Sequence, residues 1–82
     1  MNNQAKVEKG IQATVLLEYL NNAREKVRLR FETAAESGDM ARETVDQYIA
    51  DLRAFARIKD ALETVIWDGA VAARELEKEQ GE

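Results

Sequence analysis

The sequence contains no cysteine, no histidine and no proline among its 82 residues. Without cysteine and histidine the chain can form no disulfide, no thiolate or imidazole metal ligand, and no Ser/His or Cys/His catalytic pair. The four glycines are separated from one another, so there is no glycine-rich phosphate loop either. We therefore expect no metal and no cofactor, and we expect that the protein is not an enzyme.

Long hydrophobic runs are also missing. The longest uncharged stretch covers residues 10–17, far short of the ~20 apolar residues that span a bilayer. Residues 1–6 lack the basic segment and apolar run of a secretory signal. The formal net charge is −4, from 16 acidic and 12 basic residues, which does not require a polyanionic partner. These features predict a cytoplasmic protein without a membrane partner.

What the chain does contain is helix-forming residues. Alanine, glutamate, leucine, arginine and lysine supply 43 of the 82 residues, a composition typical of long helices or coiled coils. Gly38 can end a first helix in the left-handed conformation, and Asp39 can cap the start of a second. We expect an all-α fold with a single domain over 1–82: an antiparallel two-helix hairpin with helices over about 3–37 and 40–79. A Thr44–Gln47 capping box is a competing start for the second helix.

Both predicted helices carry an apolar seam. In the second, steps of three and four continue without a break, as in a heptad repeat, through Val45, Tyr48, Leu52, Phe55, Lys59, Leu62, Ile66, Gly69, Ala73 and Leu76. In the first, an eleven-residue rhythm connects Leu16, Leu20, Ala23, Val27, Phe31 and Ala34. Folding at Gly38 would place residue i opposite roughly residue 76 − i, if both helices rise equally.

Apolar residues remain after the two seams are matched, and two helices have no third element to cover them. Such a surplus usually marks an interface, so we expect a homo-oligomer, most simply a dimer that forms a four-helix bundle. The alternative is a marginal monomer with scattered exposed apolar residues. The residues that we expect at the protein interface are Leu17, Ile58, Val65, Trp67 and Val71.

Trp67 lies beside the seam and has two interpretations. It is either a hot spot for a protein partner, or a cover for Lys9 and Gly10 on the opposite helix. A separate feature is the row Glu18, Glu25 and Glu32, which we expect to be a solvated face rather than a metal site.

Four bases gather between residues 24 and 30, namely Arg24, Lys26, Arg28 and Arg30. They can form a contact surface for the phosphates of a nucleic acid. They can also be neutralised within the hairpin, where the predicted pairing brings them near Asp46 and Asp51. We favour the internal explanation because no aromatic side chains alternate with the bases for stacking.

The function that follows is a non-enzymatic protein-interaction or assembly module, chaperone-like, that acts as a helical homo-oligomer and binds an as yet unidentified protein partner. The alternative is a hairpin dimer that binds RNA or DNA through the basic cluster of the first helix. Neither hypothesis rests on a sequence motif, because helical hairpins support many functions.

Overall fold

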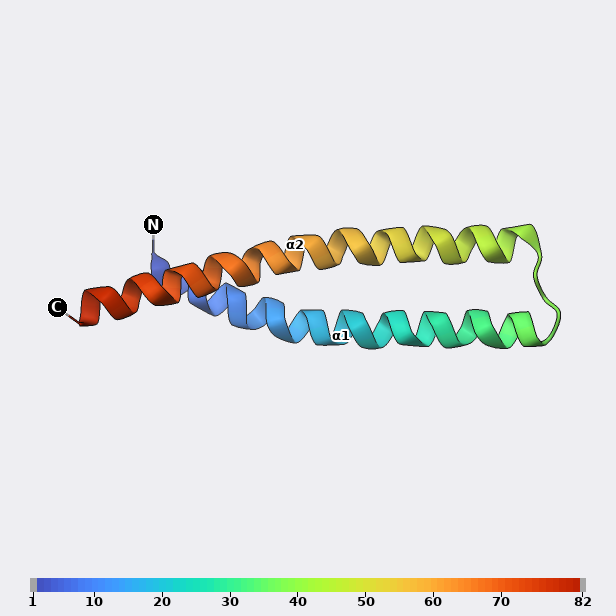
Figure 1. Ribbon diagram of the computed structural model, residues 1–82, viewed down its shortest axis with the longest axis horizontal. Helices are drawn as coiled ribbons and strands as arrows, with labels where there is room; N and C mark the ends of the chain where they lie inside the picture. Colours follow the sequence, from blue (N-terminus) through green and yellow to red (C-terminus); the bar gives the residue numbers. More distant parts are fainter. Residues whose placement is uncertain (1, 82) are drawn as a thin grey trace.

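Two long helices lie side by side and make up almost the whole molecule in the computed structural model, which describes residues 2–81 (Figure 1). Helix α1 covers Asn3–Glu36 and helix α2 covers Arg42–Gln80. The two run in opposite directions, and the molecule measures 65 × 16 × 13 Å. The predictions of an all-α chain and of two helices near these bounds are confirmed. Neither helix offers a long enough apolar segment to cross a bilayer within the described residues.

The connection between the helices is longer than the sequence predicts. Helix α1 ends in a Schellman motif, in which Gly38 takes a positive φ of 82°. Its N–H donates to the Ala35 carbonyl, and the N–H of Asp39 donates to the Ala34 carbonyl. Asp39 is therefore part of the cap of α1 and does not cap α2. The expected start at residue 40 is wrong by two positions, and the Thr44 start is wrong as well, because α2 begins at Arg42 without any side-chain cap.

The longer connection shifts the pairing of the helices. Gly10 lies against Gly69, and the rings of Phe31 and Tyr48 stack at 4.2 Å. Residue i therefore lies opposite residue 79 − i, and not 76 − i. The three-residue shift follows from the turn, since the five residues 37–41 separate the helices where the sequence suggested the two residues 38 and 39.

The heptad seam of α2 is confirmed by burial, because every one of its predicted positions except Lys59 is buried or half-buried. The Lys59 side chain extends outward instead and pairs with Glu63 at 3.8 Å. The seam of α1 differs from the prediction. Its seam also follows unbroken steps of three and four, with every position except the exposed Arg24 buried or half-buried. The positions are Asn3, Lys6, Gly10, Ala13, Leu17, Leu20, Arg24, Val27, Phe31 and Ala34. Leu17 therefore faces α2, whereas Leu16 is 54% exposed.

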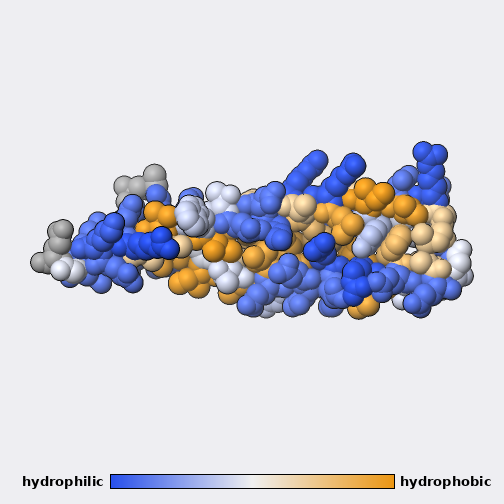
Figure 2. Space-filling view, in the orientation of Figure 1, coloured by the Kyte–Doolittle hydropathy of each residue, from blue (hydrophilic) through white to orange (hydrophobic). Residues whose placement is uncertain are grey.

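Few residues of the hairpin are buried, and the hydrophobic core is small. Only Gly10, Ala13, Gly69 and Ala72 are buried among the described residues, and none of them has a large side chain. These four small residues let the backbones of α1 and α2 touch near the chain ends. Figure 1 shows the helices crossing there and diverging toward the turn. Figure 2 shows apolar side chains reaching the surface along the hairpin between clusters of polar ones.

Replacing Gly38 with alanine should lower the stability of the hairpin by about 1 kcal/mol, because a Cβ is unfavourable at φ 82°. No atom lies within 4 Å of the position of that Cβ, so backbone strain is the whole effect. Urea unfolding followed by circular dichroism measures it. Gly38→Asn is the control, since asparagine tolerates this conformation better and should cost less. Equal stability of Gly38→Ala and wild type would contradict the turn geometry.

Candidate functional site

Leu17 and Trp67, two of the predicted interface residues, lie at one hollow on the surface. The hollow has a volume of about 480 Å³, and Ile66 and Ala70 complete its apolar lining. Leu17 is half-buried because it occupies the α1 seam, whereas Trp67 is 63% exposed. Lys59 and Glu63 form the charged edge of the hollow. An exposed tryptophan beside an apolar hollow is typical of a protein-contact surface.

Val71 lies one turn after Trp67, and the two line a second, smaller hollow of about 190 Å³. Asn3, Lys6 and Glu75 surround it, and the Asn3 side-chain amide donates to a Glu75 carboxylate oxygen at 3.0 Å. Trp67 does not cover Gly10, because the backbone of Gly69 lies directly on Gly10. The shift in pairing described above accounts for this difference. The indole is thus left on the surface between the two hollows.

Ile58 and Val65 lie on the other side of α2. They are seven residues apart and share one position of the heptad, while Trp67 follows Val65 by two residues. Two residues turn a helix by about 200°, so Val65 and Trp67 point in nearly opposite directions around the α2 axis. The five predicted interface residues therefore form two separate surfaces, and a single flat partner cannot contact all of them at once.

The basic cluster of α1 does not form one surface either. Arg28 donates hydrogen bonds to Glu25 and to Glu32 on its own helix. The hydrogen bond from Arg28 lowers the pKa of the Glu25 carboxyl below its ordinary value, and the same contact raises the pKa of Arg28. Glu25 and Glu32 are two of the three carboxylates in the row Glu18, Glu25 and Glu32, and both pair with the same arginine.

Asp46 and Asp51 do not neutralise the cluster. Asp46 is 3.8 Å from Arg42, and Asp51 accepts a hydrogen bond of 2.9 Å from Gln47. Within residues 2–81, all four ion pairs join residues of the same helix. The predicted ion pairs are therefore wrong: Arg28 pairs with glutamates of α1 itself, and Arg30 lines a groove with Asp51 without an ion pair between them.

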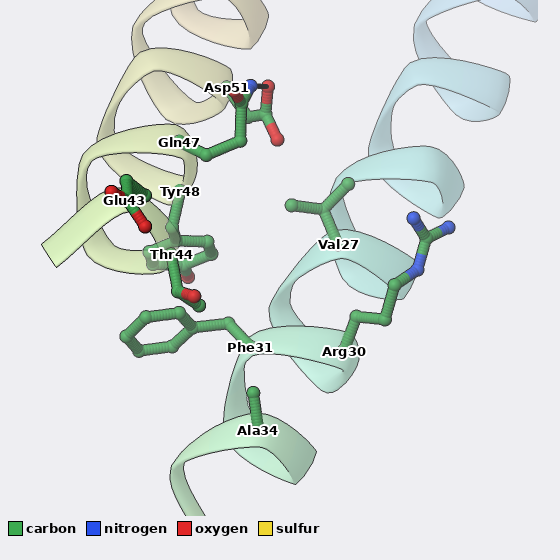
Figure 3. A pocket seen from close by; sticks show the side chains of 9 residues that line it. All are labelled: Val27, Arg30, Phe31, Ala34, Glu43, Thr44, Gln47, Tyr48 and Asp51. Carbon is green, nitrogen blue, oxygen red and sulfur yellow. Dashed lines mark hydrogen bonds between the residues drawn. The ribbon is translucent and has the colours of Figure 1, made fainter. Parts of the chain in front are cut away.

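A groove near the turn was not anticipated from the sequence. It has a volume of about 480 Å³ and opens where the helices diverge. Figure 3 shows the stacked rings of Phe31 and Tyr48 in it, with Arg30 on the α1 side and Asp51 on the α2 side. The rings are nearly parallel, at 12°. They hold the helices apart, in contrast to the glycines at the other end. The sequence did contain a signal for this groove, because Phe31 lies in the α1 seam and Tyr48 lies in the α2 seam.

Comparison of the chain with protein-family models, with curated proteins and with solved structures gave no match. The function therefore has to be argued from the surfaces just described.

Proposed function

We propose that the protein is a non-enzymatic interaction module that works as a homo-oligomer, most simply a dimer of hairpins that forms a four-helix bundle. The observation that carries this proposal is the absence of any fully buried large side chain in the described part of the chain. A protein of this size gains most of its stability from burying apolar surface. A second chain would supply the surface that the hairpin alone lacks.

The accessible area of the chain supports the same conclusion. It is 6540 Å², whereas a compact monomer of the same mass exposes about 5,000 Å² by the usual scaling of area with mass. The excess of roughly 1,500 Å² per chain is of the size that each partner of a permanent dimer buries. Nine large apolar residues have exposures between 42% and 69%, so much of the excess is apolar.

The electrostatics give no support to a catalytic role. Active sites usually hold groups whose pKa values are shifted within a cleft. Among the described residues, clear pKa shifts occur at Glu25 and Arg28, which form a largely solvent-exposed ion pair at a hollow that Tyr48 of α2 also lines. Their mutual attraction explains both shifts, so no reactive group is indicated.

The side of the hairpin that carries Trp67 is the surface that we assign to a protein partner. Its hollow is apolar at the centre, with Leu17, Ile66 and Ala70, and charged at the edge. This arrangement resembles the apolar core and polar rim of protein interfaces. Ile58 and Val65 on the other side are then free for self-association, so that assembly and partner binding use different surfaces.

Replacing Ile58 with lysine should convert the oligomer to a monomer, because the new charge would have to be buried without a partner. The molar mass measured by light scattering on a size-exclusion column should fall from at least twice the 9.3 kDa chain mass to the mass of one chain. Val15→Lys is a matched control, since Val15 and Ile58 are both 48% exposed, and it should keep the wild-type mass.

A wild-type mass of 9.3 kDa at all concentrations would overturn the proposed function. An oligomer that survives Ile58→Lys and is lost in Val15→Lys would instead place the contact on the outer face of α1.

A further inference from the structure

One side of the hairpin can be traced from the groove near the turn. Arg30 and Asp51 line this groove together, so they lie on the same side of the two helices (Figure 3). In a heptad repeat, residues seven apart keep the same orientation toward the neighbouring helix. The side that begins with Arg30 on α1 therefore continues toward the chain ends through Ala23, Leu16 and Lys9. On α2 it continues from Asp51 through Ile58 to the half-buried Val65, and the next residue of the series, Ala72, is buried against α1.

A second row of residues runs beside the Arg30 row on α1, and another runs beside the Asp51 row on α2. On α1 it lies one turn before Arg30 and contains Lys26, Tyr19 and Gln12. On α2 it begins at Gln47, which lines the same groove. We call the whole surface the split-charge face. It consists of Lys9, Gln12, Leu16, Tyr19, Ala23, Lys26 and Arg30 on α1, with Gln47, Asp51, Ala54, Ile58, Ala61, Val65, Asp68 and Glu75 on α2.

The charges of the split-charge face are sorted by helix. Its α1 half carries the bases Lys9, Lys26 and Arg30 and contains no acid. Its α2 half carries the acids Asp51, Asp68 and Glu75 and contains no base. Near the chain ends this side meets the Trp67 side, because Asp68 and Glu75 also line the hollow of Trp67 and Val71. In both halves the charges stand at the two ends of the hairpin. The middle is apolar and exposed, with Leu16 at 54%, Tyr19 at 69% and Ile58 at 48% exposure.

The side that carries Trp67 has no such order. There the α1 helix mixes Glu18 and Glu25 with Arg28, and α2 mixes Arg53 and Arg74 with Asp60. An apolar centre with opposite charges on its two halves is therefore a property of one side only.

The interior packing of the hairpin agrees with this distinction. One α1 seam position is filled by Arg24, which is exposed, while Ala23 and Leu16 of the split-charge face are apolar. The apolar stripe of α1 is thus wider than its seam and extends onto this face. Such a wider stripe is what a helix needs when its core includes a further pair of helices.

We infer that the split-charge face is the site where a second copy of this chain binds, with a two-fold axis along the length of the bundle and both turns at the same end. This inference rests on the proposed self-association and specifies its geometry. The axis places α1 of one copy on α2 of the other. The bases of each chain then meet the acids of its partner at both ends, and the apolar centres meet in the middle.

The other two-fold arrangement places the turns at opposite ends. It puts α1 on α1 and α2 on α2, so bases would face bases and acids would face acids. Like charges facing each other across an interface disfavour that pairing. A hetero-partner is not required, because the face is complementary to itself.

The size of the face is sufficient for a stable dimer. A surface 65 Å long and 16 Å wide covers about 1,000 Å², and standard interfaces bury ~800 Å² per partner.

The position of the turns decides between the two arrangements. Met40→Cys introduces the sole cysteine of the chain at the exposed turn, and a spin label there reports the distance between the two turns by pulsed dipolar spectroscopy. Helices in contact are about 8–10 Å apart, so turns at the same end should give label distances of roughly 15–30 Å. Turns at opposite ends would be separated by nearly the 65 Å length of one hairpin.

Charge reversal tests the face itself. Lys26→Glu with Arg30→Glu should weaken the dimer at least tenfold in dissociation constant, because the new glutamates would face Asp51 of the other copy near the turn. The matched control is Arg53→Glu with Arg74→Glu on the Trp67 side, which should leave the dissociation constant unchanged. Mixing the first variant with Asp51→Lys, which reverses the acid that faces residues 26 and 30 across the interface, should restore a dimer between the two.

The outcomes separate this inference from the proposed function. A dimer with distant turns, or a dimer weakened only by the Arg53 and Arg74 variant, would overturn the inferred geometry and leave self-association standing. A wild-type chain that stays monomeric, or that associates only with a different protein, would overturn both.

Discussion

Replacing Gly69 with valine should separate the two helices near the chain ends and lower the free energy of unfolding by about 3 kcal/mol, the upper part of the range for overpacked interiors. A Cβ at Gly69 would lie 3.0 Å from the Cα of Gly10 and 3.0 Å from the carbonyl oxygen of Lys6. Both are backbone atoms, which cannot move aside as a flexible side chain would. Thermal unfolding followed by circular dichroism should show a melting temperature far below that of the wild type.

The control for this variant is Ala50→Val, which adds the same kind of bulk at an exposed position of α2. Its effect should stay within about 0.5 kcal/mol, as for most surface substitutions. If Gly69→Val melts like the wild type, the close approach of Gly10 and Gly69 is not part of the folded protein. Amide hydrogen exchange of Gly69→Val would locate the effect. Protection should be lost first in the N-terminal half of α1 and the C-terminal half of α2.

Replacing Leu52 with aspartate should have an effect of similar size, about 3 kcal/mol or more, through a different cause. Leu52 is half-buried in the α2 seam and lines a hollow with Leu20 and Phe55. An aspartate there would replace the apolar contacts with Leu20 and Phe55 by a charged group, and Arg24 and Lys59, which line the same hollow, would offset only part of that cost. We expect loss of most of the helical circular dichroism signal at 37 °C.

Leu29→Asp makes the same chemical change at an exposed position, since Leu29 is 49% exposed. It should retain its helical signal and cost no more than about 1 kcal/mol. A Leu52→Asp protein that remains as helical and as stable as Leu29→Asp would show that the seam of α2 does not face α1.

Much of the fold could be predicted from the sequence because it depends on local order. The absence of proline and the helix-forming composition predict two long helices, and Gly38 marks the turn through its positive φ. The heptad of α2 is continuous in the sequence, and burial follows it. In each case the pattern lies within a single helix and can be read from neighbouring residues, although α1 is what buries the α2 seam.

The errors arose where two residues competed for one role. Asp39 is a good helix cap by type, but its backbone N–H is already bonded to Ala34 in the Schellman motif. Leu16 and Leu17 are equally apolar, and only the register of α1 against α2 makes Leu17 the inward residue. The pairing of Gly10 with Gly69 likewise depends on the length of the connection, which the residue types alone left undecided.

The candidate surfaces were also predicted only in part. The sequence identified Ile58, Val65, Trp67 and Val71 as surplus apolar residues, since their number exceeds what two helices can cover. It could not show that Val65 and Trp67 point to different sides, nor that Arg28 pairs with Glu25 and Glu32.

By itself, the sequence determined the helices, the turn and the apolar excess, because propensity and periodicity act within a single helix. The tertiary structure decided the register, the backbone contact of the two glycines and the sorting of charges onto one side, because these depend on how α1 and α2 are placed against each other.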